Sequence, residues 1–471
     1  MIFLTDIFSL DIYNMTMISV PVVKQLMKAV GEEKCSVSPE NLEKHAHDAS
    51  SHQPILPEIV LYPTNTFEVS KILQIVYKHS LPITVCGARS GLEGNAIPLK
   101  HGIVLDMTRM KKIVKVIKND FQVIVEPGII GEELNKELAK FNLYFPAFPA
   151  SSSIATIGGM IANNAGGMYA VKYGVVGDWV MALEVVLANG EIINVGSRSI
   201  KSVAGYDLKS LFIASEGTLG VITKATLKVI SCLKQKFLFK VSFPSVENAV
   251  AATIESLSEN LQPAAMEMLD TSSVRYVNAF KKINWDEATT LLIEIHEKDL
   301  GEKKEILERI FKKHQAISYV MAKNDEEMKE IWQCRKSVHP AIMDSGENIS
   351  MIIGDIGVPL SQIPVFVKEV KKVEEEFKLA MPMFGHIGDG NFHFWIIYDN
   401  QQPASFKKAK EASQRLVESA LALGGTCTAE HGVGIGKRAY LQKEHPDNIE
   451  LMKGIKSLLD PQGILNPGKM F

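Results

Sequence analysis

Two short segments of the 471-residue chain contain side chains that could hold a metal ion and move a proton. GHIGDGNFH contains His386 and His393, and AEHGVG contains Glu430 and His431. Asp389-Gly390 is typical of a tight turn, so we predict a hairpin in which residue 388 pairs with 391 and His386 stands opposite His393. Such cross-strand neighbours lie about 4.5–5.5 Å apart at Cβ, close enough to bind one ion.

Histidine pairs are also common as structural residues, and His386 and His393 alone favour that interpretation. The second segment shifts the balance towards a metal. Glu430 can add a carboxylate ligand, and His431 beside it can act as an acid or a base.

A glycine-rich segment, CGARSGLEGNAIP, follows a predicted strand and contains Gly87, Gly91 and Gly94. Glycines allow several backbone N–H groups to converge on one anion, and a pyrophosphate would suit such a loop. An ordinary glycine turn explains this segment alone about equally well. The segment does not match G-x-G-x-x-G and no helix signal follows it, which disfavours a nicotinamide site of the Rossmann type.

A second segment, SSSIATIGGMIANNAGG, has two glycine pairs, Gly158-Gly159 and Gly166-Gly167, around a short predicted helix that ends at Asn163-Asn164. Close backbone approach at both pairs would suit a flat ring.

Local signals predict the elements that position these segments. From Ile59 the chain reads as a β-α-β unit, with a helix capped by Asn65 and Glu68. Asn189-Gly190 predicts a hairpin. We predict further strands at 102–107, 112–117 and 122–128, a helix at 132–141, and, after about Leu233, longer amphipathic helices at 245–258, 302–314, 360–377 and 404–423.

Together with GYDLKSLFIASEGTLGVIT and DPQGILNPGKMF, these motifs resemble the FAD-linked oxidases that have the vanillyl-alcohol oxidase type of flavin domain. The resemblance runs from about Ile59 to Phe471. It implies an α+β fold: a two-part FAD-binding domain of the vanillyl-alcohol oxidase/PCMH type, an α/β ferredoxin-like substrate cap and a short C-terminal helical return. We place a helical lead-in at 1–50, the FAD domain at 51–233, the cap at 234–424 and the return at 425–471.

By this resemblance the first glycine loop wraps the FAD pyrophosphate, the next two motifs line the adenosine and isoalloxazine, and the C-terminus closes the site. Because none of these segments contains histidine, we expect noncovalent FAD. The implied flavin residues are Gly87, Arg89, Ser90, Gly91, Leu92, Gly94, Asn95, Ile157, Gly158, Gly159, Asn163, Asn164, Gly166, Gly167, Glu216, Gly220, Ile222 and Asn466.

The histidine motifs resemble the subfamily that contains D-lactate dehydrogenase, the FAD subunit of glycolate oxidase and D-2-hydroxyglutarate dehydrogenase. That similarity implies that His386, His393 and Glu430 bind a divalent metal and that His431 acts on the substrate. Nitrogen and oxygen ligands suit Zn or Mn. Arg335, which would otherwise be taken for a surface charge, matches the arginine that grips the substrate carboxylate in the relatives.

The resemblance implies oxidation of a small D-2-hydroxy acid, D-lactate or glycolate. The chain has neither a four-cysteine iron–sulfur run nor C-x-x-C-H, so an external acceptor is expected: a quinone, a cytochrome or an iron–sulfur partner subunit. Alternatives are D-2-hydroxyglutarate dehydrogenase, an aromatic-alcohol or sugar oxidase of the same superfold, and a flavin-binding electron-relay subunit. Relatives that oxidise the diacid carry lysine and asparagine at positions that match Ile353 and Trp395 here, which argues for a monoacid.

Composition excludes some partners. With 51 basic and 54 acidic residues, the chain has no net positive field to draw nucleic acid. Five scattered cysteines favour a reducing compartment, so we expect a cytoplasmic protein, peripheral to a membrane at most through its acceptor, and compatible with a homodimer. Residues 1–20 are apolar, but Asp6 and Asp11 interrupt them, and we predict neither a signal peptide nor a membrane span there.

Overall fold

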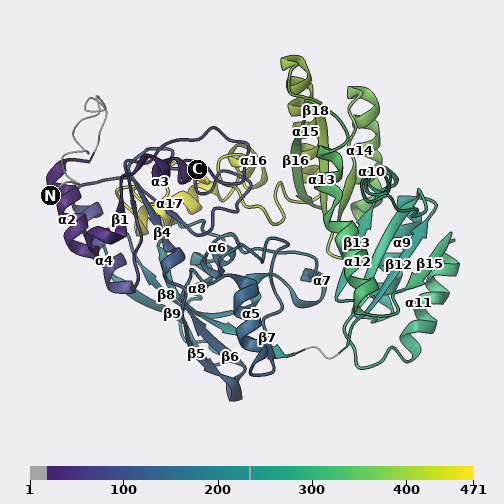
Figure 1. Cartoon of the computed structure of the whole chain (residues 1–471), viewed down its shortest axis with the longest axis horizontal. Coiled ribbons are helices and arrows are strands. Elements are labelled where there is room, and N and C mark those ends of the chain that lie inside the picture. Colours follow the sequence, from purple (N-terminus) through teal and green to yellow (C-terminus); the bar gives the residue numbers. More distant parts are fainter. Residues whose placement is uncertain (1–17, 233–234) are drawn as a thin grey trace. The chain divides into compact units, whose positions relative to one another are not determined.

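The computed structural model describes residues 18–232 and 235–471, which form two compact units (Figure 1). Unit 1 contains the chain up to Ala165, then Val175–Cys232 and Glu430–Phe471, and unit 2 contains Gly166–Gly174 and Leu233–Ala429. Most of the apolar amino terminus lies outside the described residues. Within the described ranges, no helix is both long and apolar enough to cross a bilayer.

The first sheet of unit 1 has four strands in the order β1-β2-β4-β3. The predicted β-α-β unit forms, and Asn65 caps its helix by accepting a hydrogen bond from the Glu68 N–H at 3.0 Å. However, β2 and β3 are not neighbours, because β4 inserts between them and runs parallel to both. The elements are α2 (Val20–Val30), η1 (Glu32–Lys34), β1 (Cys35–Ser36), α3 (Pro39–Lys44), β2 (Ile59–Leu61), α4 (Thr66–Lys78), β3 (Ile83–Cys86) and β4 (Ile103–Asp106).

The second sheet of unit 1 is antiparallel, in the order β5-β6-β10-β8-β9, and β11 and β7 form a separate two-stranded sheet. The predicted Asn189-Gly190 hairpin is confirmed as β8 and β9, with Gly190 at a φ of 85°. The remaining elements of unit 1 are η2 (Met107–Arg109), β5 (Ile113–Ile117), η3 (Lys118–Asp120), β6 (Gln122–Val125), α5 (Gly131–Ala139), β7 (Leu143–Tyr144), α6 (Ile157–Asn163), η4 (Val176–Trp179), β8 (Val180–Val186), β9 (Ile192–Gly196), α8 (Lys209–Phe212), β10 (Val221–Lys228), β11 (Ile230–Ser231), α16 (Arg438–Glu444) and α17 (Ile449–Leu459).

Unit 2 is built on a seven-stranded sheet in the order β15-β12-β14-β13-β17-β18-β16, in which all neighbouring strands are antiparallel. The four helices predicted after Leu233 form α9, α11, α14 and α15. Its elements are α7 (Ala170–Tyr173), β12 (Phe237–Phe243), α9 (Val246–Ser258), β13 (Ala265–Leu269), α10 (Thr271–Lys281), β14 (Thr289–Ile295), α11 (Glu302–Lys313), β15 (Ser318–Met321), α12 (Asp325–Lys336), α13 (Val338–Met343), β16 (Ile349–Gly357), η5 (Leu360–Gln362), α14 (Ile363–Phe377), β17 (Met383–His386), β18 (Asn391–Asp399) and α15 (Pro403–Ala422).

One face of the seven-stranded sheet is covered by α10, α12 and α13 (Figure 1), which share a buried apolar cluster with Leu238, Leu269, Leu292, Phe384 and Trp395 of the strands. Side chains of a strand alternate between faces, so every second residue from these five also points to this side. This rule places a set of polar side chains on the covered face, at the edge of the apolar cluster.

Candidate flavin and metal sites

The covered face of the unit 2 sheet carries a row of buried polar side chains, each from a different neighbouring strand. Following the strand order from β14 to β16, these are Glu294, Glu267, His386, His393 and Asp355. The two predicted metal histidines thus belong to a larger polar row whose acidic members the motifs did not reveal.

The predicted hairpin register is wrong, although both histidines do lie together. His386 pairs with Asn391, and His393 pairs with Phe384. The connection is a four-residue loop, 387–390, rather than the predicted two-residue turn, which shifts the pairing by two residues. A shift of two preserves the face. The rings therefore still meet, with centroids 5.4 Å apart and planes at 88°.

His386 is fixed by Glu267, which is fully buried on the neighbouring strand β13. The Nδ1 atom of His386 is hydrogen-bonded to the Glu267 Oε1. Burial raises the pKa of Glu267, but its electrostatic interactions and hydrogen bonds with His386 and Arg335 outweigh burial and leave that pKa below its usual value.

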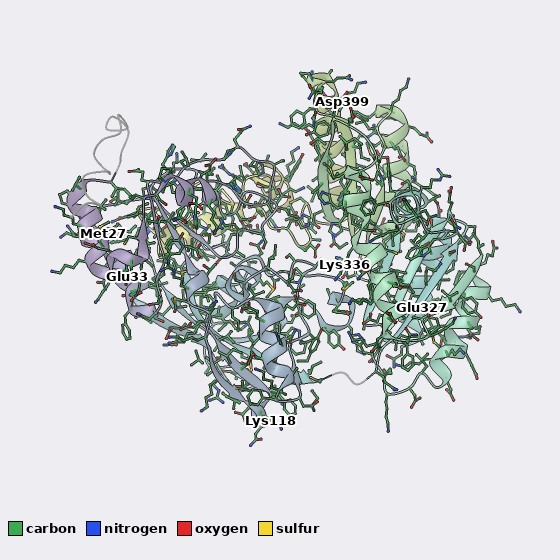
Figure 2. The ribbon with its side chains drawn as sticks, in the orientation of Figure 1. Met27, Glu33, Lys118, Glu327, Lys336 and Asp399 are labelled. Carbon is green, nitrogen blue, oxygen red and sulfur yellow. The ribbon has the colours of Figure 1, made fainter. Side chains whose placement is uncertain are left out.

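Arg335, the predicted carboxylate-binding residue, lies in the last turn of α12 and also contacts Glu267. Its Nε and Nη2 lie 2.8 and 2.7 Å from the Glu267 Oε2, and its guanidinium carbon lies 4.6 Å from the centre of the Phe384 ring. The neighbouring Lys336, labelled in Figure 2, is exposed. Arg335 is therefore a partly buried, oriented group and not a surface charge.

Asp355 connects the histidines to the segment that leads to Glu430. It stands opposite His393 on β16 and accepts hydrogen bonds from the Asn391 Nδ2 at 2.9 Å, the Thr428 hydroxyl at 2.9 Å and the Ala429 N–H at 3.0 Å. Ala429 is the last residue of unit 2, and Glu430 and His431 open the return segment of unit 1. The residues that immediately precede Glu430 are thus anchored at the histidine pair.

The donor chemistry of the two unit 2 histidines suits a divalent cation. Because Glu267 occupies Nδ1 of His386, the other ring nitrogen of that histidine is the one that can bind an ion. Two imidazoles with a carboxylate form a donor set suited to Zn or Mn. His386 and His393 are the unit 2 residues that would hold it, and Glu430 is the predicted third ligand.

In unit 1, the first glycine loop lies against the second glycine segment. A Cβ added to Gly87 would come within 2.2 Å of the Thr156 Oγ1, so only glycine fits there. Arg89 adopts a φ of 57°, and its Nη1 lies 3.2 Å from the Asp106 Oδ2, which also binds His45 at 2.9 Å. The loop thus combines close backbone approach with an anchored cation, which fits the pyrophosphate of FAD.

The second segment forms the predicted short helix, α6, capped by Thr156. Asn164 ends it in the left-handed conformation and accepts from the Gly177 N–H at 2.8 Å. Asn163 donates from Nδ2 to the backbone carbonyl of His431 at 3.3 Å. The second glycine pair, Gly166 and Gly167, belongs to unit 2.

Glu216 was predicted to line the flavin, and its carboxylate is fully engaged with protein groups. It accepts from the N–H of Val433 at 2.6 Å and of Gly434 at 2.9 Å, and from the Asn95 Nδ2 at 2.8 Å. Burial raises the pKa of Glu216 despite these hydrogen bonds. Its backbone carbonyl accepts from Asn466. Glu216 therefore joins three predicted flavin motifs to the segment after His431.

Lys469 is a buried cation that the motifs did not reveal. Its ammonium donates to the backbone carbonyls of Asn95 at 2.8 Å and Ile97 at 2.6 Å, next to the first glycine loop. Burial lowers the pKa of Lys469 to about 8. Lys469 follows the predicted flavin residue Asn466 in the NPGK motif, and this closeness in sequence could have suggested that the lysine also contacts the flavin loops.

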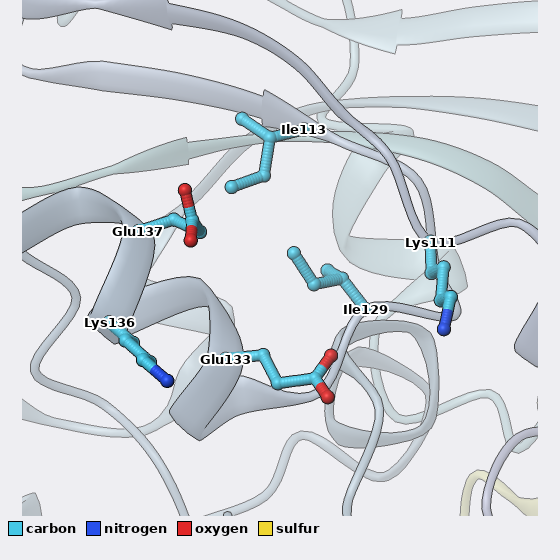
Figure 3. Close-up of a pocket in the computed structure, with 6 residues that line it drawn as sticks. All are labelled: Lys111, Ile113, Ile129, Glu133, Lys136 and Glu137. Atoms are coloured by element: carbon cyan, nitrogen blue, oxygen red, sulfur yellow. The ribbon is translucent and has the colours of Figure 1, made fainter.

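The remaining predicted flavin residues lie in three places of unit 1. Ser90, Gly91, Leu92 and Gly94 are in the first loop, Ile157, Gly158 and Gly159 are in the first turn of α6, and Gly220 and Ile222 lie just before and within the start of β10. A separate pocket of unit 1 lies between α5 and the β5 region (Figure 3) and contains none of the predicted site residues. It is lined by Lys111, Ile113, Ile129, Glu133, Lys136 and Glu137.

Comparison with known proteins gives matches for both parts of the chain. Residues 57–196 match an FAD binding domain, and residues 234–470 match the C-terminal domain of FAD linked oxidases. The chain is 36% identical over 455 residues to a probable mitochondrial D-lactate dehydrogenase of Danio rerio, covering 95% of this chain and 91% of that protein. It is 34% identical over 460 residues to the glycolate oxidase subunit GlcD of Bacillus subtilis, covering 97% of each.

Among solved structures, p-cresol methylhydroxylase with substrate bound aligns with a TM-score of 0.79 at 18% identity, over 96% of each chain. This likeness confirms the predicted α+β fold with a PCMH-type flavin domain. The chain therefore belongs to the FAD-linked oxidases and is an FAD-linked oxidoreductase.

Proposed function

We propose that this chain oxidises a small D-2-hydroxy acid, D-lactate or glycolate, to the 2-oxo acid. In this proposal it binds FAD noncovalently, and a divalent metal, Zn or Mn, is held by His386, His393 and Glu430. The names of the relatives, D-lactate dehydrogenase and glycolate oxidase subunit, support this chemical class.

One observation carries the proposal: Arg335 and His386 share the buried carboxylate of Glu267. A group suited to a substrate carboxylate and a group suited to a metal are thereby held side by side. Such a pair suits a 2-hydroxy acid, whose carboxylate and hydroxyl are on adjacent carbons. An aromatic alcohol or a purely electron-relaying flavin would need neither.

The roles of the residues follow from their chemistry. Bound FAD supplies the hydride acceptor, and a bound divalent cation supplies polarisation of the substrate oxygens. Arg335 keeps three N–H groups beyond the two that face Glu267, enough for a bidentate grip on a carboxylate. His431 takes the proton of the 2-hydroxyl as the C2 hydride leaves.

Substrate size is proposed from two residues beside the histidine pair. Ile353 and Trp395 face each other across β16 and β18. They lie two residues along their strands from Asp355 and His393, and therefore on the same face of the sheet. Trp395 is buried, and its indole Nε1 has no hydrogen-bond acceptor among the described residues. A second carboxylate would find no cation at either position, which favours a monoacid.

The acceptor is proposed to be a quinone, a cytochrome or an iron–sulfur partner subunit. None of the five cysteines forms a disulfide, which supports the proposal of a reducing, cytoplasmic location, with any membrane association through that partner. A homodimer is compatible with this function.

Metal analysis combined with a substrate panel tests the proposal. Purified protein is assayed with D-lactate, L-lactate, glycolate, D-2-hydroxyglutarate and vanillyl alcohol, using an artificial electron acceptor. We expect one bound divalent metal and turnover of the small D-2-hydroxy acids. Turnover of the aromatic alcohol alone, or of none of the five, contradicts the proposal.

A further inference from the structure

Glu267 lies at a point where two functional groups from distant parts of the chain meet. It is in the middle of β13, between Met266 and Met268, whose side chains point to the opposite face of the sheet. Its two oxygens divide their partners: Oε1 binds the His386 Nδ1, and Oε2 binds the Nε and Nη2 of Arg335. Glu267 is fully buried, so water does not compete for these contacts.

The first consequence concerns the protonation of His386. A carboxylate can only accept, so the Nδ1 atom must carry a proton. In this tautomer the Nε2 atom carries the lone pair that metal binding requires. An amide in place of the carboxylate could instead donate to Nδ1, which would move the ring proton to Nε2 and block metal binding.

The second consequence concerns the orientation of Arg335. The contacts to Glu267 fix one edge of the guanidinium, and Phe384 lies against its face at 4.6 Å. The remaining N–H groups are therefore presented in one direction, without the loss of side-chain entropy that a free arginine would incur on binding. The plane and the open edge of Arg335 depend on Glu267.

We propose that Glu267 is a positioning residue that sets the His386 tautomer and the Arg335 orientation together, so that metal and substrate carboxylate bind side by side. This inference rests on the proposed function for the identity of the two ligands. It adds to that function a residue that touches neither ligand but couples their binding.

The chain offers a matched control in Glu294. This residue is on the adjacent strand β14, is equally buried and also binds a histidine, His296, together with the Trp332 Nε1 at 2.6 Å. Glu294→Gln therefore removes a buried carboxylate with comparable partners from the same sheet face. A general effect of burying an amide would be the same in both variants.

The experiment compares wild type, Glu267→Gln and Glu294→Gln, each with FAD bound. Imidazole ¹⁵N chemical shifts report the His386 tautomer in metal-free protein, assigned with His386→Gln. Titration with Mn²⁺ followed by electron paramagnetic resonance gives affinity, and steady-state assays give KM. We expect the Nδ1–H tautomer in wild type and in Glu294→Gln. Glu267→Gln should lose that tautomer, bind Mn²⁺ about 10–100-fold more weakly and raise KM.

If Glu267→Gln does not fold, the His386 tautomer of the wild-type protein still tests the proposal. A wild-type His386 protonated at Nε2 overturns it, and so does a folded Glu267→Gln variant with wild-type tautomer and Mn²⁺ affinity. If the tautomer depends on Glu267 but wild type neither binds Mn²⁺ nor oxidises any 2-hydroxy acid, the positioning role stands and the proposed function fails.

Discussion

The carboxylate of Glu216 accepts a hydrogen bond from the backbone N–H of Val433 at 2.6 Å, two residues after His431. The same carboxylate binds Asn95 of the first glycine loop and the N–H of Gly434. One buried anion thus holds both a flavin loop and the segment that carries the proposed base. The position of His431 is coupled to the flavin site through this contact.

Replacing Glu216 by Gln should therefore weaken both stability and turnover. A glutamine offers one acceptor oxygen in place of two, which leaves a buried N–H without a partner and costs about 1–3 kcal/mol of unfolding free energy. Urea denaturation measures this loss, and hydrogen exchange at 431–434 should rise as kcat falls. Glu184→Gln, which removes contacts to Thr66 and Lys224 elsewhere in unit 1, is the control. Equal kcat in wild type and Glu216→Gln would show that the contact serves only folding.

The metal ligands and the flavin loops are separate in the chain, so a variant that loses the metal should still bind FAD. His386→Ala and Glu430→Ala should each lose the bound metal and most turnover while FAD content stays at the wild-type level. Mass spectrometry measures the metal, and absorbance measures flavin. His101→Ala removes an exposed histidine of unit 1 and should change neither. A ligand variant with wild-type metal content and turnover would show that the proposed coordination is wrong.

Lys469 should give stability a dependence on alkaline pH. Its folded pKa of about 8 lies below the value near 10.4 of an unfolded lysine. Between these values the unfolded chain binds more protons than the folded chain, so the unfolding free energy rises with pH. Urea melts of wild type and Lys469→Met at pH 7.5 and 9.5 test this. The stability of wild type relative to the variant should increase by about 1–2 kcal/mol over that interval, and a constant or decreasing difference would contradict it.

A cation and an amide beside the histidine pair should admit a diacid. The double variant Ile353→Lys, Trp395→Asn should raise the ratio of kcat/KM for D-2-hydroxyglutarate over D-lactate by at least about tenfold, because a paired carboxylate avoids an uncompensated desolvation cost of several kcal/mol. Met351→Lys is the control, since Met351 lies on the same face of β16 but two residues further from Asp355 than Ile353 does. An equal gain in the control would mean that added charge, and not its position, changes the preference.

Much of the local structure could be predicted because its signals are local. Asn65 and Asn189-Gly190 act within a few residues, and the cap and the hairpin that they predict both form. The insertion of β4 between β2 and β3 was not predictable from such signals, since strand order depends on contacts across the whole sheet. The hairpin after His386 was given the wrong register because Asp389-Gly390 marks a turn without fixing the loop length.

The acidic residues that support the site were missed for a related reason. Glu267 lies 68 residues from Arg335 and 119 from His386 in the chain, so no motif contains the group. In the sequence it appears only as a single charge between Met266 and Met268. Asp355 was not among the predicted site residues, whereas the fold makes it the anchor of the segment before Glu430.

Anaerobic stopped-flow absorbance tests whether this chain oxidises a small D-2-hydroxy acid, because it observes reduction of bound FAD by substrate without any acceptor. The protein is mixed with D-lactate, glycolate, L-lactate or D-2-hydroxyglutarate, and bleaching near 450 nm is followed. We expect fast, saturable bleaching by D-lactate or glycolate, slower bleaching by the diacid and none by L-lactate. Failure of every 2-hydroxy acid to bleach the flavin, or faster bleaching by D-2-hydroxyglutarate than by both monoacids, would contradict it.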